Sequence, residues 1–154
     1  MYLRDVFETL SASLYHGTNF YAALQVIKTN TILDKTPHQF PSGPMNGVSL
    51  TRSRRFAMHW GDIIFELDRN RLAQRHRLIP FNYWHRGTER SQSDAREEAE
   101  EFIIGSIAPA DRYIMAIYIR AKSLRFLQQR NDDSHGAYET LLRHPLLQTV
   151  DAVP

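Results

Sequence analysis

Residues 14–18 read LYHGT, a short apolar approach that leads into His-Gly-Thr. The apolar residues predict a brief strand, and Gly17 permits a sharp exit that other residues would adopt only with strain. A helical pattern follows at once, and Thr18 or Asn19 can cap that helix. His16, an open backbone position and a hydroxyl therefore meet at a strand-to-helix junction, a common place to bind a polar ligand. A His-Gly pair also occurs in ordinary turns, so the rest of the chain must decide between these interpretations.

The composition fits one globular domain with a core of its own. The chain has 154 residues, of which 42% are apolar and 23% charged, which argues against disorder. There is no cysteine, which excludes disulfides, thiolate zinc sites and a cysteine nucleophile. No apolar run approaches the ~20 residues needed to cross a bilayer, and the first residues do not form a signal-peptide pattern. We therefore expect a cytoplasmic protein with no membrane partner.

The periodicity of the sequence predicts alternating strands and helices. Strands are expected at residues 13–15, 31–33, 47–51, 62–68, 76–80, 100–105 and 113–119. Helices are expected at residues 1–12, 20–28, 54–60, 123–130 and 136–144. Loops or turns are expected at residues 34–46, which hold three prolines, at the charged residues 69–75, and at 81–96. This order predicts a single α+β domain with a split or mixed sheet.

Two further groups of polar residues accompany apolar strands. Ser49 and Thr51 are two residues apart in an expected strand and so share one of its faces. Glu101 stands at the leading edge of the strand at residues 100–105, after the long loop. The neighbouring glutamates allow a second interpretation, in which this stretch is merely a solvated acidic run.

Together, the His-Gly-Thr turn, the Ser49-x-Thr51 strand and Glu101 before an apolar strand resemble the catalytic domain of ADP-ribosyltransferases. Members of that fold carry a His or Arg on an early strand, a Tyr or Ser on a middle strand, and a Glu on a late one. The opening is similar to the poly-ADP-ribose polymerase and diphtheria-toxin branch, whereas the middle strand is similar to the branch with an Arg and a Ser-Thr-Ser pattern. The resemblance implies split mixed or antiparallel sheets flanked by short helices, in a single domain over residues 1–154.

The resemblance also implies that NAD is the co-substrate and that no metal is needed. His16 would bind the ribose of the adenosine half of NAD, and the backbone of Gly17 would pair with the nicotinamide carboxamide. Thr18, Ser49 and Thr51 would line the binding pocket.

The resemblance places an aromatic side chain on the nicotinamide ring and a carboxylate beside its ribose. Trp60 stands at the matching spacing beyond Ser49, and Phe56, one helical turn earlier, competes for the stacking role. Glu101 would hold the ribose next to the bond that breaks. Breaking that bond develops positive charge on the sugar, and a fixed carboxylate stabilises this charge more in the transition state than in the ground state.

The expected acceptor is a macromolecule, either a protein or a nucleic acid. Arg86, Arg90 and Arg96 lie in the loop where the family usually recognises its acceptor, and they suit a phosphate-bearing or acidic target. Many members place a Glu or Gln two residues before the catalytic Glu, and here that position is Ala99, so an arginine acceptor is not expected. Because the middle strand carries Ser49 rather than Tyr, mono-ADP-ribosyl transfer is favoured over polymer formation.

Two other functions remain open on the same residues. An RNA 2'-phosphotransferase-like enzyme shares the His-Gly opening and consumes NAD, but it relies on basic residues instead of a late Glu. A non-catalytic module on the same fold could bind NAD or a nucleic acid without chemistry.

Overall fold

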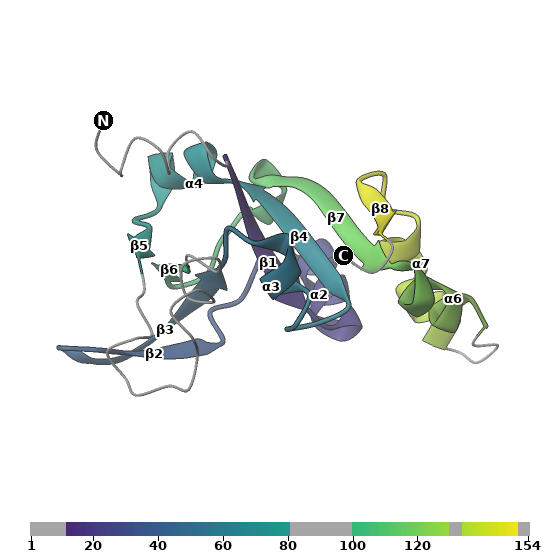
Figure 1. Ribbon diagram of the computed structural model, residues 1–154, viewed down its shortest axis with the longest axis horizontal. Helices are drawn as coiled ribbons and strands as arrows, with labels where there is room; N and C mark the ends of the chain where they lie inside the picture. Colours follow the sequence, from purple (N-terminus) through teal and green to yellow (C-terminus); the bar gives the residue numbers. More distant parts are fainter. Residues whose placement is uncertain (1–11, 81–99, 130–133, 151–154) are drawn as a thin grey trace.

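In the computed structural model, which describes residues 12–80, 100–129 and 134–150, two four-stranded sheets carry the fold (Figure 1). The first sheet has the order β1-β4-β7-β8, with β1 (Ser13–Thr18), β4 (Ile63–Asp68), β7 (Ile114–Arg120) and β8 (Leu147–Val150). Only its β7–β8 pair is parallel. The second sheet is antiparallel, in the order β2-β3-β6-β5, with β2 (Thr36–Phe40), β3 (Gly43–Leu50), β6 (Glu101–Ile104) and β5 (Ile79–Pro80). The predicted α+β class is therefore confirmed.

Short helices and turns connect and cover the strands. They are α2 (Phe20–Thr29), α3 (Arg54–Ala57), α4 (Arg69–Arg75), η2 (Ala110–Arg112), α6 (Ala121–Gln129) and α7 (Ser134–Leu142). The helix expected after the His-Gly-Thr turn is present, and Asn19 caps it by accepting a hydrogen bond from the backbone N–H of Ala22 at 2.8 Å. None of the described helices combines the length and hydropathy needed to cross a bilayer.

The loop predicted over residues 34–46 is wrong, because most of it forms the hairpin of β2 and β3. Pro37 lies on β2, which is an edge strand, and Pro44 lies where β3 pairs only with β2. Proline is tolerated at such positions because one side of the strand needs no backbone donor. Gly43 closes the hairpin with a φ of +117°, a left-handed conformation that favours glycine.

Three other expectations at this level need correction. Residues 69–75 form α4 rather than a turn, because the carboxylate of Asp68 accepts from the N–H of Arg71 at 3.0 Å and caps the helix. The strand expected at 76–80 shrinks to Ile79–Pro80, and that at 31–33 to one bridge between Ile32 and Ile107. The sequence pattern did not indicate β8. The expected helix at 1–12, apart from Ala12, and the loop at 81–96 lie outside the described residues.

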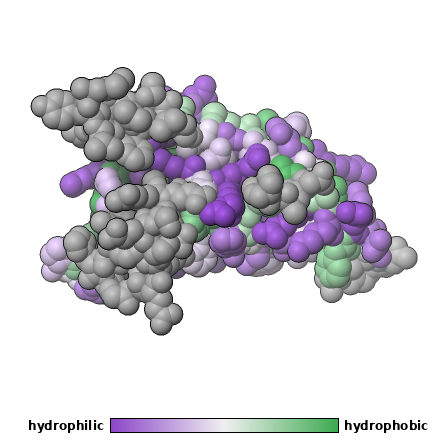
Figure 2. All heavy atoms as spheres, viewed as in Figure 1, coloured by the Kyte–Doolittle hydropathy of each residue, from purple (hydrophilic) through white to green (hydrophobic). Residues whose placement is uncertain are grey.

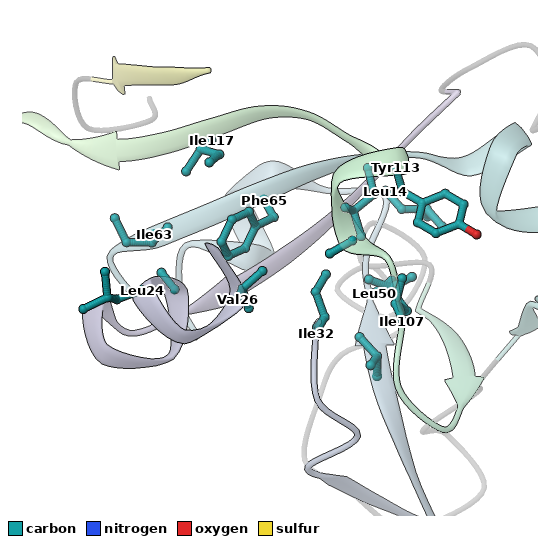
Figure 3. Packing of buried hydrophobic residues seen from close by; sticks show 14 of the residues in the cluster. Leu14, Leu24, Val26, Ile32, Leu50, Ile63, Phe65, Ile107, Tyr113 and Ile117 are labelled. Carbon is teal, nitrogen blue, oxygen red and sulfur yellow. The ribbon is translucent and has the colours of Figure 1, made fainter. Parts of the chain in front are cut away.

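The larger of two apolar clusters spans both sheets and includes α2 (Figure 3). Ile63 and Phe65 of β4 are fully buried and pack with Leu24 and Val26 of α2, while Leu50 extends the cluster into the second sheet. The face drawn in Figure 2 is largely hydrophilic where its residues are described, and hydrophobic residues gather near the end that carries α6. One cluster that spans both sheets identifies this part of the chain as a single small domain.

The backbone joins the two sheets next to His16. The N–H of Tyr15 donates to the carbonyl of Thr51 at 2.8 Å, and the N–H of Thr51 donates to the carbonyl of Tyr15 at 3.0 Å. This bridge brings the middle of β1 against the residue that follows β3. Residues that are more than thirty positions apart in the sequence therefore share one location.

Candidate functional site

A pocket of about 320 Å³ opens where the two sheets meet, beside β1, α2 and α3. It is lined by Tyr15, His16, Gly17, Thr18, Asn19, Tyr21, Ala22, Gln25, Val26, Thr31, Ile32, Leu33, Lys35, Thr36, Ser49, Thr51, Ala57 and Trp60. Its volume is within the range of small-molecule sites, and its wall mixes apolar with hydrogen-bonding side chains. Among these described residues, Lys35 alone carries a fixed charge at neutral pH.

The structure brings most of the predicted site residues to this pocket. His16, Gly17 and Thr18 come from β1, Ser49 comes from the end of β3, and Thr51 directly follows that strand. Trp60 also lines the pocket and is 60% exposed. Phe56 is instead buried, with its ring edge-on to His59, and it is not among the described lining residues.

Gly17 is required here by close packing. A Cβ atom built on Gly17 would lie 1.9 Å from the carbonyl oxygen of Ala57 at the end of α3. Any larger residue would therefore push α3 away from β1. The sequence predicted this position as a turn, whereas the structure places it in β1, paired with Ile64.

His16 is held by the backbone of the neighbouring sheet. Its Nδ1 lies 3.1 Å from the carbonyl oxygen of Ser49, and because a carbonyl only accepts, Nδ1 carries the proton. Burial lowers the pKa of His16 below its usual value of 6.5, and the hydrogen bond to Ser49 opposes this shift only in part. The ring is therefore neutral at pH 7, and Nε2 keeps a lone pair that can accept a hydrogen bond from a ligand hydroxyl.

Glu100, which the sequence did not single out, lies behind the pocket and is connected to it through Ser49, a lining residue. The hydroxyl of Ser49 donates to its Oε1 at 2.5 Å, and Nε2 of His38 lies 2.7 Å from the same oxygen. The side chain is only 2% exposed, and its Oε2 has no hydrogen-bond partner among the described residues. Buried carboxylate oxygens are normally hydrogen-bonded, so this atom calls for an explanation.

Glu101 lies on the other face of the same strand, away from Ser49. Arg52 donates to its Oε1 at 3.0 Å, and Arg69 donates to both oxygens at 3.0–3.2 Å. Neither Glu101 nor Glu100 is among the described lining residues of the pocket, but only Glu100 is hydrogen-bonded to a residue that is, Ser49. The structure therefore gives Glu101 an ion-pair role and does not bring it together with His16.

The difference between the two glutamates follows from strand register. Ser49 pairs with Phe102, and Leu50 pairs with Glu101, so alternation places Glu100 on the face of Ser49. Residues 102–104 are all apolar, so both faces of β6 look alike in the sequence. The sequence alone therefore did not indicate whether Glu100 or Glu101 shares the face of Ser49.

The predicted acceptor residues Arg86, Arg90 and Arg96 lie outside the described residues. Within the part of the chain that is described, no three His, Asp or Glu side chains are grouped to hold a metal ion.

No protein-family model, curated protein or solved structure significantly matches this chain. Any assignment of function therefore rests on the geometry of the pocket and the chemistry of its side chains.

Proposed function

We propose that this protein is a mono-ADP-ribosyltransferase with an ADP-ribosyltransferase-like fold, which cleaves NAD and transfers ADP-ribose to a protein or nucleic acid. The observation that carries the proposal is the connection from His16 through Ser49 to Glu100, whose Oε2 is buried and unpartnered among the described residues. A neutral imidazole nitrogen can accept a hydrogen bond from a ribose hydroxyl, and a carboxylate can accept a stronger, charge-assisted one.

The carboxylate role that the family resemblance assigns to Glu101 passes to Glu100. As the bond from C1' of the ribose to the nicotinamide nitrogen breaks, its electron pair leaves with nicotinamide, and positive charge develops on the sugar. The carboxylate of Glu100 stabilises this charge in a site shielded from water, where electrostatic stabilisation is strongest. A lone pair of the acceptor then forms the new bond to C1', and the acceptor's proton passes to solvent.

The remaining lining residues suit the other parts of NAD. The exposed ring of Trp60 offers a surface on which nicotinamide can stack, which favours Trp60 over Phe56 for this role. Lys35 supplies a positive charge for the pyrophosphate. The backbone of Gly17 lies open toward the pocket, as pairing with the carboxamide requires.

The new assignment also changes the expectation for the acceptor. With Glu100 beside the ribose, the position two residues earlier is Glu98 rather than Ala99. The reason for setting aside an arginine acceptor therefore falls away, and a protein arginine joins the acceptors to be tested.

Incubation of the full chain with NAD tests the proposal, with nicotinamide release followed by chromatography and ADP-ribose adducts followed by mass spectrometry. We expect nicotinamide release, with adducts on a macromolecule when a cell lysate is supplied. Binding of NAD without release would favour the non-catalytic module. Transfer of a 2'-phosphate from RNA would favour the RNA 2'-phosphotransferase-like enzyme, and the absence of both binding and release would overturn the proposal.

A further inference from the structure

His38 is a buried histidine that the proposed chemistry does not yet use. It lies on β2, it is 4% exposed, and its ring stacks on Phe102 of β6 with centroids 4.2 Å apart and planes 18° apart. The stack fixes the plane of the imidazole. It joins β2 to β6, with β3 between them in the sheet. A histidine held this firmly presents its ring nitrogens in fixed directions.

Both ring nitrogens of His38 face oxygen atoms. Nδ1 lies 2.8 Å from the carbonyl of Pro37, which only accepts, so Nδ1 carries a proton. Nε2 lies 2.7 Å from Oε1 of Glu100, and this bond also needs a proton. Because Oε1 already accepts from the hydroxyl of Ser49, the proton fits best on Nε2. The pair is then an imidazolium and a carboxylate.

A positively charged His38 would lower the cost of burying the carboxylate of Glu100. An ionised carboxylate buried alone is costly and takes up a proton instead, and a neutral carboxylic acid cannot stabilise a developing cation. The imidazolium of His38 offsets the cost of burying Glu100, and with Ser49 it occupies Oε1. Oε2 is buried as well and has no hydrogen-bond partner among the described residues.

We propose that His38 is a positioning residue that holds the carboxylate of Glu100 ionised and its Oε1 fixed behind Ser49, so that the carboxylate can act on the ribose of NAD in the proposed reaction. The inference rests on the proposed function for its substrate, but the protonation of His38 can be measured without any ligand. His38 acts through Glu100 and is not expected to touch the substrate.

Two substitutions of His38 separate positioning from packing. His38→Phe keeps a ring against Phe102 and removes both hydrogen bonds, whereas His38→Gln keeps a donor that can reach Oε1. We expect His38→Phe to lower kcat for nicotinamide release about 10- to 100-fold, which is the effect of losing the residues that orient metal ligands in other proteins. The KM for NAD should stay within about threefold of the wild-type value. His38→Gln should restore only part of kcat, because its amide donates to Oε1 but carries no positive charge. A KM change as large as the kcat change, or no rescue by Gln, would overturn the inference.

Nitrogen NMR of the His38 ring in the free protein provides the second test. At neutral pH we expect both nitrogens to be protonated in the wild type and in Glu101→Gln, and only one to be protonated in Glu100→Gln. A neutral ring in the wild type would overturn the inference whatever the kinetics show. If the ring is doubly protonated but NAD is neither bound nor cleaved, the ion pair stands and the proposed function fails.

Discussion

His16 connects burial to ligand recognition through its protonation state. Because burial lowers its pKa below 6.5, the unfolded chain binds more protons than the folded one between that lowered pKa and 6.5. The stability contributed by a neutral His16 is thus complete above about pH 6.5 and is lost as the pH falls toward the folded pKa. Burial also lowers the pKa of His76 and His144, so these residues too make the folded state less stable as the pH falls.

The first prediction concerns the pH dependence of NAD affinity. Protonated Nε2 cannot accept a hydrogen bond, so the Kd for NAD should rise as the pH falls through the lowered pKa of His16. Calorimetric titrations between about pH 5 and 8 measure this, with His16→Gln as the non-titrating control. A Kd that stays constant in the wild type, or tightens at low pH, would contradict the role given to Nε2.

The sequence predicted which kinds of side chain the site holds, but not in every case which residue supplies them. His16 and Ser49 were recognisable because a turn motif and strand alternation identified them locally, whereas Trp60 was named only because the family resemblance places an aromatic residue at its spacing. Glu100 and His38 were not, because their roles depend on the register of β6 against β3 and on a hairpin hidden among prolines. Pairing between distant strands is set by tertiary packing, which a single sequence does not reveal.

At the scale of elements, the ion pairs of Glu101 attach β6 to the start of α4. The Glu101 side chain is 6% exposed and meets the guanidinium groups of Arg52 and Arg69, which are 17% and 25% exposed. Glu101→Gln should lower the free energy of unfolding by about 2 kcal/mol, because two charged hydrogen-bond donors lose their anion. In urea unfolding, the matched control Glu139→Gln, which breaks an exposed pair with Arg143, should cost less than about 0.5 kcal/mol. Equal effects of the two variants would show that the buried cluster does not stabilise the fold.

The packing of α3 on β1 gives another prediction at this scale. Gly17→Ala should lower the free energy of unfolding by about 3 kcal/mol, because the new Cβ would meet the backbone oxygen of Ala57 at 1.9 Å. Gly105→Ala is the control, since it has open space around it and adds only the strain of a φ of +83°, about 1 kcal/mol. If Gly17→Ala were the milder of the two in urea unfolding, the close approach of α3 would be wrong.

At the scale of the whole molecule, the fold gathers three distant parts of the chain around one pocket. His16 comes from β1 and Ser49 from the end of β3, while Glu100, directly before β6, lies behind Ser49; the backbone bridge between Tyr15 and Thr51 joins the two sheets. The α+β class and the central strands β4 and β7 were predictable, because their apolar runs are long and rich in β-branched residues. The order of elements predicted a split or mixed sheet, and the family resemblance predicted split sheets, but neither predicted which strands pair in each sheet, since pairing between distant strands leaves no local pattern.

Ligand binding at this junction should stabilise the whole domain. At an NAD concentration 100 times the Kd, linkage predicts a gain of about 2.7 kcal/mol in the free energy of unfolding and a corresponding rise in Tm. The measurement is a thermal melt with and without NAD, and Trp60→Ala should weaken the shift because it removes the exposed ring at the pocket. An unchanged Tm at saturating NAD would argue against binding in the folded state.

The most direct measurement compares the rates of nicotinamide release by Glu100→Gln and Glu101→Gln. The two substitutions are chemically identical and adjacent, yet they lie on opposite faces of β6. We predict that Glu100→Gln slows release about 100-fold, equivalent to roughly 2.7 kcal/mol, while Glu101→Gln stays within a few-fold of the wild type when both are folded. Release that survives in Glu100→Gln and is lost in Glu101→Gln would contradict the assignment of the carboxylate that faces the sugar.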